Sequence, residues 1–201
     1  MKSSQVNPQN DGWEIVSRET HFRNDHLEVS TEEIRTPARS APRKWTVVHR
    51  KRAVVIAPMT PDGKIILIRQ ERLPIRAAIW EMPAGQIDEA NEQNPRAIEA
   101  VALRELREET GFELAEGGEL VSLGDYFTSP GFTDEQGYFF LARPVRSNAD
   151  GHARDDSESI LDCRAFSAQE LGRMIDANEI RDANTLGICA RLVARGLLKL
   201  G

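Results

Sequence analysis

The chain has 201 residues, of which 40% are hydrophobic and 29% charged, a balance typical of a folded globular protein and too apolar for a disordered one. Its net charge of −6 argues against a dedicated nucleic-acid-binding protein. No apolar run approaches the roughly 20 residues of a membrane span, and the first residues lack the apolar segment of a secretory signal, so we expect a cytoplasmic protein with no membrane partner.

The cysteines and the short motifs exclude several kinds of site. Cys163 and Cys189 are isolated in apolar surroundings, which favours free buried thiols over a disulfide. The sequence contains no CxxC, no HExxH and no GxxxxGK. Zinc chemistry and a P-loop are therefore not expected.

The N-terminal region is expected to consist of short strands. Residues 13–16 and 21–29 alternate in polarity, which predicts strands around a turn at Asn24 and Asp25. Two prolines within 36–42 predict a break in regular structure. The region is too small to bury a core of its own, so we expect it to lean on another surface.

Basic residues are concentrated at the end of this region. Seven lysines and arginines, and no acidic residue, lie between Arg35 and Arg52. They form either a solvated strand edge that is protected from aggregation by its charge, or a positive rim that attracts a substrate with phosphates. Aromatic residues are scarce there apart from Trp45, which disfavours single-stranded RNA as the ligand.

The following residues predict the strands of a larger domain. Runs at 53–57 and 64–70 are expected to be strands joined by a turn at 61–63. A short strand at 78–82 leads into Pro83-Ala84-Gly85, where Gly85 is expected to allow a sharp turn. Further strands are expected at 120–123, 126–127, 137–142 and 160–166, and helices after a capping box at Ser167 and an N-cap at Asn184.

One predicted helix, at 97–110, carries an unusual set of acids. Gly111 stands where a helix needs a left-handed C-terminal residue. Glu105, Glu108 and Glu109 are spaced i, i+3 and i+4, so their carboxylates project from one side. Leu103 and Leu106 are expected to anchor the helix to a core.

Two interpretations of these acids are possible. Like charges one turn apart cost roughly 0.2–0.5 kcal/mol on an exposed helix, and a cation between them removes that cost. Three oxygen donors without histidine or cysteine suit a hard cation, Mg²⁺ or Mn²⁺. The alternative is a solvated acidic face paired with Arg104 and Arg107.

The residues 104–112 match, position for position, the second half of the Nudix box, R-E-U-x-E-E-x-G-U, where U is a bulky apolar residue. Residues 81–85 resemble the loop that opens the box, and the resemblance to Nudix hydrolases extends from about Val54 to Phe166. One departure is an apparent insertion at 88–95. The box places a glutamate six residues after Gly85, where this chain has Asn91; Glu89 and Glu92 are possible substitutes.

The resemblance implies a role for each site residue. Glu105 and Glu109 would bind the metal with the Ala84 carbonyl, and Glu108 would be a ligand or hold a water. Glu158, in a polar loop before a strand, would be the general base, although a solvated acidic loop is the alternative. Arg104 would orient the glutamates through ion pairs.

Two further elements resemble the ADP-ribose pyrophosphatase branch of the family. The segment Gln70-Glu71-Arg72-Leu73-Pro74 would place Arg72 on a substrate phosphate. An arginine can donate two parallel hydrogen bonds to a phosphate, which a lysine cannot do. The loop from Ser129 to Glu135 would lie over the substrate, with Glu135 contacting the substrate or a metal-bound water. Taken alone, these would be a surface arginine and an ordinary Pro-Gly turn.

The resemblance also implies a fold and a substrate. We expect an α/β protein, the Nudix α/β/α sandwich with a mixed β-sheet and an N-terminal β extension, with residues 1–50 as the strand region and 51–201 as the hydrolase domain. Branch members are commonly dimers, in which Phe22 or Arg50 would reach the partner's substrate site.

The expected reaction is metal-dependent cleavage of a nucleoside diphosphate sugar, ADP-ribose first, to AMP and ribose 5-phosphate. GDP-mannose, FAD or a dinucleoside polyphosphate are alternative substrates. A sensor that binds a nucleotide sugar without cutting it is disfavoured because all three helix glutamates are present.

Overall fold

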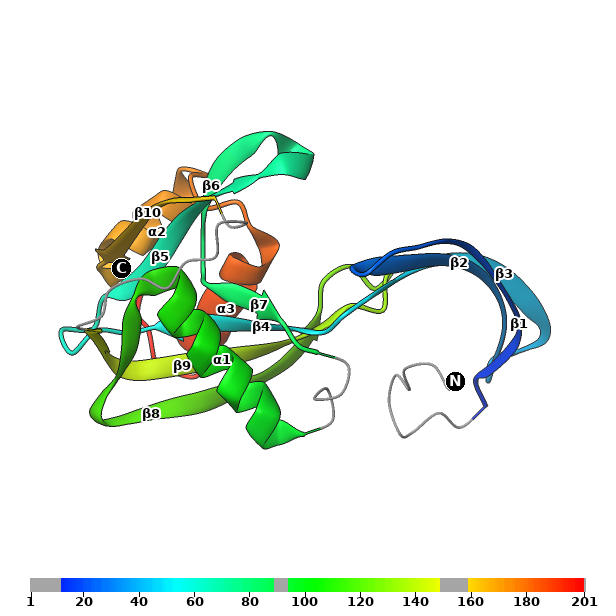
Figure 1. Cartoon of the computed structure of the whole chain (residues 1–201), viewed down its shortest axis with the longest axis horizontal. Helices are drawn as coiled ribbons and strands as arrows, with labels where there is room; N and C mark the ends of the chain where they lie inside the picture. The colour runs from blue at the N-terminus through cyan, green and yellow to red at the C-terminus, as the bar shows by residue number, and fades with distance from the viewer. Residues whose placement is uncertain (1–11, 89–93, 149–158, 201) are drawn as a thin grey trace. The chain divides into compact units, whose positions relative to one another are not determined.

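The computed structural model describes residues 12–88, 94–148 and 159–200 (Figure 1). The chain divides into two compact units. The first contains residues 1–51 together with 127–136, and the second contains 52–126 and 137–201. The loop at 127–136 thus belongs with the N-terminal strands, which the sequence did not predict. The placement of the domain boundary after residue 50 stays a prediction.

Three antiparallel strands in sequential order make up most of the first unit: β1 (Glu14–Arg23), β2 (Leu27–Thr36) and β3 (Arg39–Arg50). The Asn24 side chain closes the predicted first turn by accepting hydrogen bonds from the backbone N–H groups of His26 and Leu27. The predicted break over 36–42 is confirmed only at Pro37 and Ala38, and the chain is a strand again from Arg39. The chain turns at Pro37 and Ala38, and β3 already contains Pro42, which an edge strand tolerates.

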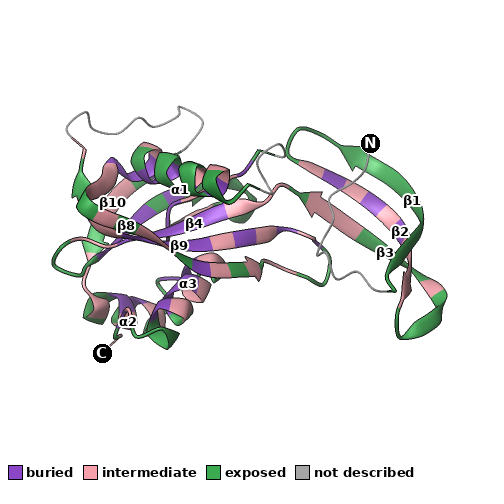
Figure 2. Cartoon of the chain, turned by 90° about the horizontal axis from the view of Figure 1, so that it is seen from below, coloured by how far each residue is buried: buried purple, intermediate pink, exposed green. Residues whose placement is uncertain are grey.

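The first unit has no apolar core in its described residues (Figure 2). Its buried side chains on β2 are polar, and Glu28, Ser30 and Glu32 alternate along one face. Phe22 is 53% exposed, and the whole of β1 is exposed. The expectation that this region cannot bury a core of its own is confirmed.

The second unit contains two sheets, of order β7-β4-β9-β8 and β10-β5-β6. β4 runs parallel to β9 and antiparallel to β7, so the first of these sheets is mixed as expected. β4 and β5, predicted as successive strands, lie in different sheets and share only the bridge between Met59 and Ile65. The bounds are β4 (Ala53–Pro58), β5 (Ile65–Arg72), β6 (Ala77–Glu81), β7 (Ala84–Gln86), β8 (Phe112–Phe127), β9 (Gln136–Ser147) and β10 (Ile160–Phe166), with a short 3-10 turn η1 (Leu73–Ile75) after β5.

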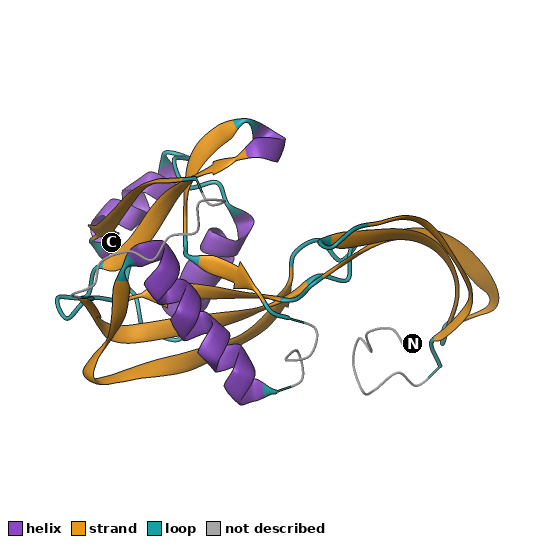
Figure 3. Ribbon diagram, in the orientation of Figure 1, coloured by secondary structure: helices purple, strands orange, loops and turns teal. Residues whose placement is uncertain are grey.

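Helices cover both faces of these sheets (Figure 3). Successive side chains of a strand point to opposite faces. Val54 and Ile56 of β4 therefore join a core beneath α1 (Pro95–Thr110). Val55 and Ala57 join the core on the other side, beneath α2 (Ala168–Asp176) and α3 (Ala183–Ala194). The expected α/β/α sandwich with an N-terminal β region is confirmed.

The helix ends follow local chemistry, with two corrections. Gly111 ends α1 in the left-handed region at φ 72°, and Ser167 forms the predicted capping box. The N-cap of α3 is Asp182, two residues before the predicted Asn184. Leu103 does not anchor α1, since it is 37% exposed, whereas Leu106 is fully buried. The other buried apolar residues of α1, Ile98 and Ala102, precede Leu106 at intervals of four.

Cys189 is buried and Cys163 half-buried, and both are free thiols as expected. Burial raises the pKa of Cys189 to about 11. Among the described residues, no helix has the length and apolar character needed to cross a membrane.

Candidate active site

Two glutamates of α1 are buried one helical turn apart. Glu105 is 5% exposed and Glu109 is 2% exposed, and α1 packs against β4 and β7. The side chain of Glu108 is 34% exposed. The structure therefore brings Glu105 and Glu109 to the same buried stripe and leaves Glu108 at its border, as spacings of four and three residues require.

Arg104 forms ion pairs with both Glu105 and Glu108. Its guanidinium contacts Glu105 Oε1 at 2.6 Å through Nη2 and Glu108 Oε2 at 2.5 Å through Nη1. Burial lowers the pKa of Arg104, but Glu105 and Glu108 together raise it above its usual value. The guanidinium is thus a fixed positive charge between two carboxylates.

Gly85 allows β7 and α1 to lie close together. A Cβ at this position would lie 2.0 Å from Glu105 Cδ and 2.1 Å from its Oε1. Gly85 does not have a positive φ, so the expected sharp turn is not the reason for glycine. Glycine is needed because the Glu105 carboxylate occupies the space that a side chain would take.

Ala84 is bound to the second buried glutamate. Its N–H donates to Glu109 Oε2 at 2.8 Å. Pro83 O accepts from Ile56 N–H at 2.9 Å, so the next pair, Val55 and Ala84, is a non-hydrogen-bonded pair of the antiparallel ladder. The N–H and the carbonyl of Ala84 therefore both point away from β4, towards the free edge of β7.

These donors suit a hard divalent cation, because two buried carboxylates and an outward carbonyl are all oxygens. In the part of the chain that the structure describes, no three His, Cys, Asp or Glu side chains converge closely enough to enclose an ion. Glu105 and Glu108 are paired with Arg104 instead, and Glu109 with the Ala84 N–H.

A second ion pair lies on the adjoining sheet. Arg72 donates to Glu81 from Nε at 2.9 Å and from Nη2 at 2.6 Å, and Glu81 is 3% exposed. The hydrogen bonds that Arg72 donates to Glu81 raise the pKa of Arg72. Burial raises the pKa of Glu81, and outweighs the lowering by Arg72. The Arg72 side chain remains 42% exposed, so its outer edge is accessible to a ligand.

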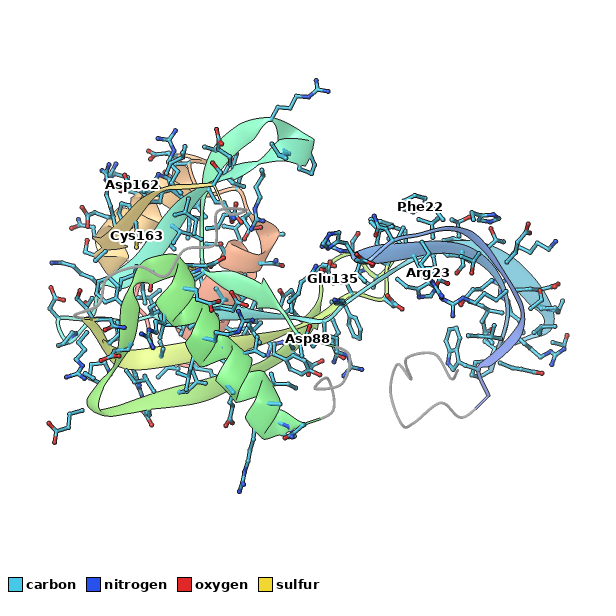
Figure 4. All side chains as sticks on the ribbon, in the orientation of Figure 1. Phe22, Arg23, Asp88, Glu135, Asp162 and Cys163 are labelled. Carbon is cyan, nitrogen blue, oxygen red and sulfur yellow. The ribbon has the colours of Figure 1, made fainter. Side chains whose placement is uncertain are left out.

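Phe22, Arg50 and Glu135 lie in the first unit, and Phe22 and Glu135 are labelled in Figure 4. Glu158 lies outside the described residues. Arg50 Nη1 contacts Glu135 Oε1 at 3.3 Å, and Thr128 Oγ1 donates to Glu135 Oε2 at 3.0 Å. The structure thus brings Arg50 and Glu135 together. Phe22 is an exposed side chain of β1.

Sequence reasoning missed the residues that fasten the loop from Ser129 to Glu135 to β3. His49 Nδ1 lies 2.6 Å from Asp134 Oδ2, and its Nε2 lies 2.9 Å from Ser30 Oγ. Trp45 Nε1 donates to Gly131 O at 2.9 Å. These partners are separated by 85 and 86 residues in the sequence, so no local pattern indicates them.

Comparisons with known proteins identify the family to which the chain is related. A family model described as NUDIX domain matches residues 49–186. An ADP-ribose pyrophosphatase of Bacillus subtilis (strain 168) is 29% identical over 170 residues, which cover 85% of this chain and 86% of that protein. A GDP-mannose pyrophosphatase of Enterobacter sp. (strain 638) is 33% identical over 141 residues, which cover 67% of this chain and 69% of that protein.

A solved structure has a similar fold. The crystal structure titled "ADP compounds hydrolase" superposes with a TM-score of 0.69 at 21% identity, and the match covers 98% of this chain and 100% of that chain. At this identity the match supports the fold alone.

Proposed function

This chain belongs to the Nudix family and is a pyrophosphohydrolase, and we propose that it cleaves the diphosphate of ADP-ribose to AMP and ribose 5-phosphate. The observation that carries the proposal is the pair of buried carboxylates, Glu105 and Glu109, held against the backbone of Ala84 and Gly85. The pyrophosphatase relatives support a nucleoside diphosphate sugar as the substrate class.

Nudix hydrolases generally use divalent cations, and we assign Mg²⁺, or Mn²⁺ in its place, to this chain. Glu105, Glu109 and the Ala84 carbonyl would hold the ion, with Glu108 as a ligand or as the residue that holds a water. When bound, the ion would offset the negative charge of the diphosphate, polarise the phosphorus centre and acidify a water.

The chain's own side chains supply positioning and proton transfer. Arg104 fixes Glu105 and Glu108 by ion pairs before an ion binds. Arg72, oriented by Glu81, presents its exposed edge to a phosphate. Glu158 accepts the proton of the attacking water, so no nucleophilic side chain is required.

We propose that the protein acts as a homodimer in which Arg50 and Phe22 serve the partner's substrate site. The first unit supports this proposal, since its apolar side chains at Trp13, Ile15, Val16 and Phe22 are 54%, 52%, 44% and 53% exposed. A second copy of the chain would bury them. A nucleic-acid substrate is not proposed, given the net charge of −6.

A second candidate substrate is GDP-mannose, because one relative is a GDP-mannose pyrophosphatase. FAD and dinucleoside polyphosphates complete the set to be compared. The test measures kcat/KM with Mg²⁺ for ADP-ribose, ADP-glucose, GDP-mannose, FAD and a diadenosine polyphosphate by release of the nucleoside monophosphate. We expect ADP-ribose to rank first, and a higher kcat/KM for GDP-mannose would reassign the substrate.

A further inference from the structure

The first turn of α3 is hydrogen-bonded to the segment Met82–Ala84, which leads from β6 into β7. Thr185, fully buried in the first turn of α3, accepts a hydrogen bond on Oγ1 from the backbone N–H of Met82 at 2.9 Å. Met82 is 1% exposed, so water does not reach this N–H in place of the hydroxyl. The two residues are 103 positions apart in the sequence.

The hydroxyl of Thr185 is oriented by the N-cap of its own helix. Asp182 Oδ2 accepts from Thr185 Oγ1 at 2.7 Å and from Thr185 N–H at 2.8 Å. A hydroxyl has one proton to donate and two lone pairs that accept. Since its proton points to Asp182, Thr185 can only accept from Met82, and the acceptor is strengthened by the carboxylate behind it.

The loop is consequently held from three elements. Thr185 of α3 holds the N–H of Met82, Ile56 of β4 holds the carbonyl of Pro83 at 2.9 Å, and Glu109 of α1 holds the N–H of Ala84. Three consecutive residues thus have three different partners, and the last partner is a proposed metal ligand. A shift at Met82 would therefore move Ala84 relative to Glu109.

The same helix end acts on the neighbouring ion pair. The negative charge of Asp182 contributes to raising the pKa of both Glu81 and Arg72, after the larger effects of burial on Glu81 and of hydrogen bonding on Arg72. Asp182 thus acts on both members of the ion pair between Arg72 and Glu81, the residue that immediately precedes Met82.

We propose that Thr185 is a positioning residue for the hydrolysis: its hydroxyl, oriented by Asp182, fixes the backbone from Met82 to Ala84 so that the Ala84 carbonyl stands beside Glu109 for the divalent cation. This inference rests on the proposed function. It assigns a role in the reaction to the C-terminal helix, which lies on the opposite side of the sheets from α1.

The test compares Thr185→Val, which keeps the shape but loses the acceptor, with Thr185→Ser, which keeps it. Ile188→Val is the matched control, because Ile188 is fully buried on α3 and its truncation removes one methylene group from the core without removing the hydrogen bond to Met82. Three quantities are measured for each protein: Mn²⁺ affinity by electron paramagnetic resonance without substrate, kcat and KM for ADP-ribose, and amide exchange of the peptide that contains Met82 to Ala84.

We expect Thr185→Val to weaken Mn²⁺ binding about tenfold and to lower kcat about 10- to 100-fold, as loss of an indirect partner of a metal site does. KM should stay within about twofold, exchange at Met82 should accelerate, and Thr185→Ser and Ile188→Val should resemble wild type. If Thr185→Val does not fold, Thr185→Ala replaces it in the same comparison.

Mn²⁺ affinity and kcat of Thr185→Val equal to those of Ile188→Val would overturn the inference and leave the proposed function intact. A wild-type protein that neither binds Mn²⁺ nor cleaves any nucleoside diphosphate would overturn the proposed function, and this inference with it.

Discussion

At the scale of single residues, Glu105 and Glu109 have different partners although both are buried on α1. Glu105 is held by a guanidinium and fills the space above Gly85, whereas Glu109 accepts from the backbone of Ala84. A buried carboxylate without compensation is costly. Glu105 is compensated by the positive charge of Arg104, and Glu109 accepts from the backbone N–H of Ala84.

Glu109→Gln should lower kcat at least about 100-fold, because loss of even an indirect partner of a metal site costs 10- to 100-fold. The fold should persist, since the Gln carbonyl oxygen can still accept from Ala84 N–H. Steady-state kinetics with ADP-ribose and a thermal melt check both points. Glu99→Gln, an exposed substitution on the same helix, is the control and should behave as wild type. Near wild-type kcat in Glu109→Gln would rule out the ligand set.

At the scale of elements, the site depends on how closely β7 and α1 approach each other, and Gly85 sets that approach. Gly85→Ala would place a methyl group on the Glu105 carboxylate. Because the atoms displaced are the end of a flexible side chain, the thermal midpoint should change little, while the Glu105 carboxylate has to leave its present position.

We expect Gly85→Ala to lower kcat by about 10- to 100-fold and to raise the Mg²⁺ concentration needed for half-maximal activity. Gly187→Ala is the matched control, since its Cβ would meet Phe139 Cζ at 3.1 Å on the opposite face of the sheets. Equal kinetics in the two variants would show that the space above Gly85 has no part in the reaction.

The sheet β1–β3 is stabilised by charge pairs in place of an apolar core, and this makes it sensitive to acid. Burial raises the pKa of Glu28, but Arg23, Arg18 and Thr20 together lower it below its usual value. A carboxyl whose folded pKa is lowered stabilises the fold above its unfolded pKa, and this stabilisation is lost as the pH falls through the folded pKa.

Glu28→Gln should therefore be less stable than wild type at neutral pH, and the difference should shrink as the pH falls below about 4.5. Chemical denaturation across this range, followed by Trp fluorescence, measures it. Glu14→Gln is the control, because it removes the ion pair with Arg35, in which the Glu14 side chain is 58% exposed. We expect no measurable change in the free energy of unfolding. A constant difference between Glu28→Gln and wild type at all pH values would contradict this assignment.

The features that the sequence predicted correctly have local causes. The helix that ends at Gly111, the capping box at Ser167 and the turn at Asn24 each follow from residues within a few positions. Leu103 was assigned to the core because it lies near Leu106, but only the sheet decides which stripe of a helix is buried. Asp182 and Asn184 are both good N-caps, and local sequence does not choose between them.

At the scale of the whole molecule, contacts within each of the two units join residues that lie far apart in the sequence. The Nudix box identifies the glutamates, and the resemblance supplies Ala84 and Arg72. The contacts of Met82 with Thr185, and of His49 with Asp134, span 103 and 85 residues. Such partners are brought together by the order of strands and helices, which a single sequence does not encode in any local pattern.

The proposed dimer makes a prediction about mixed molecules. If Arg50 serves the partner's site, Arg50→Ala and Glu109→Gln should each be nearly inactive alone. Randomly mixed dimers should recover roughly a quarter of wild-type activity, because half are heterodimers with one intact site. Co-expression with two affinity tags measures this. If Arg50 instead acts within its own chain, the mixture stays inactive.

We propose that the buried carboxylates of α1 hold a divalent cation that supports cleavage of a nucleoside diphosphate. Phosphorus NMR of ADP-ribose with the purified protein tests it, before and after Mg²⁺ is removed with EDTA and then restored. We predict AMP and ribose 5-phosphate with Mg²⁺, none with EDTA, and recovery when Mg²⁺ returns. Cleavage that persists in EDTA, or no cleavage of any nucleoside diphosphate with Mg²⁺, would contradict the account.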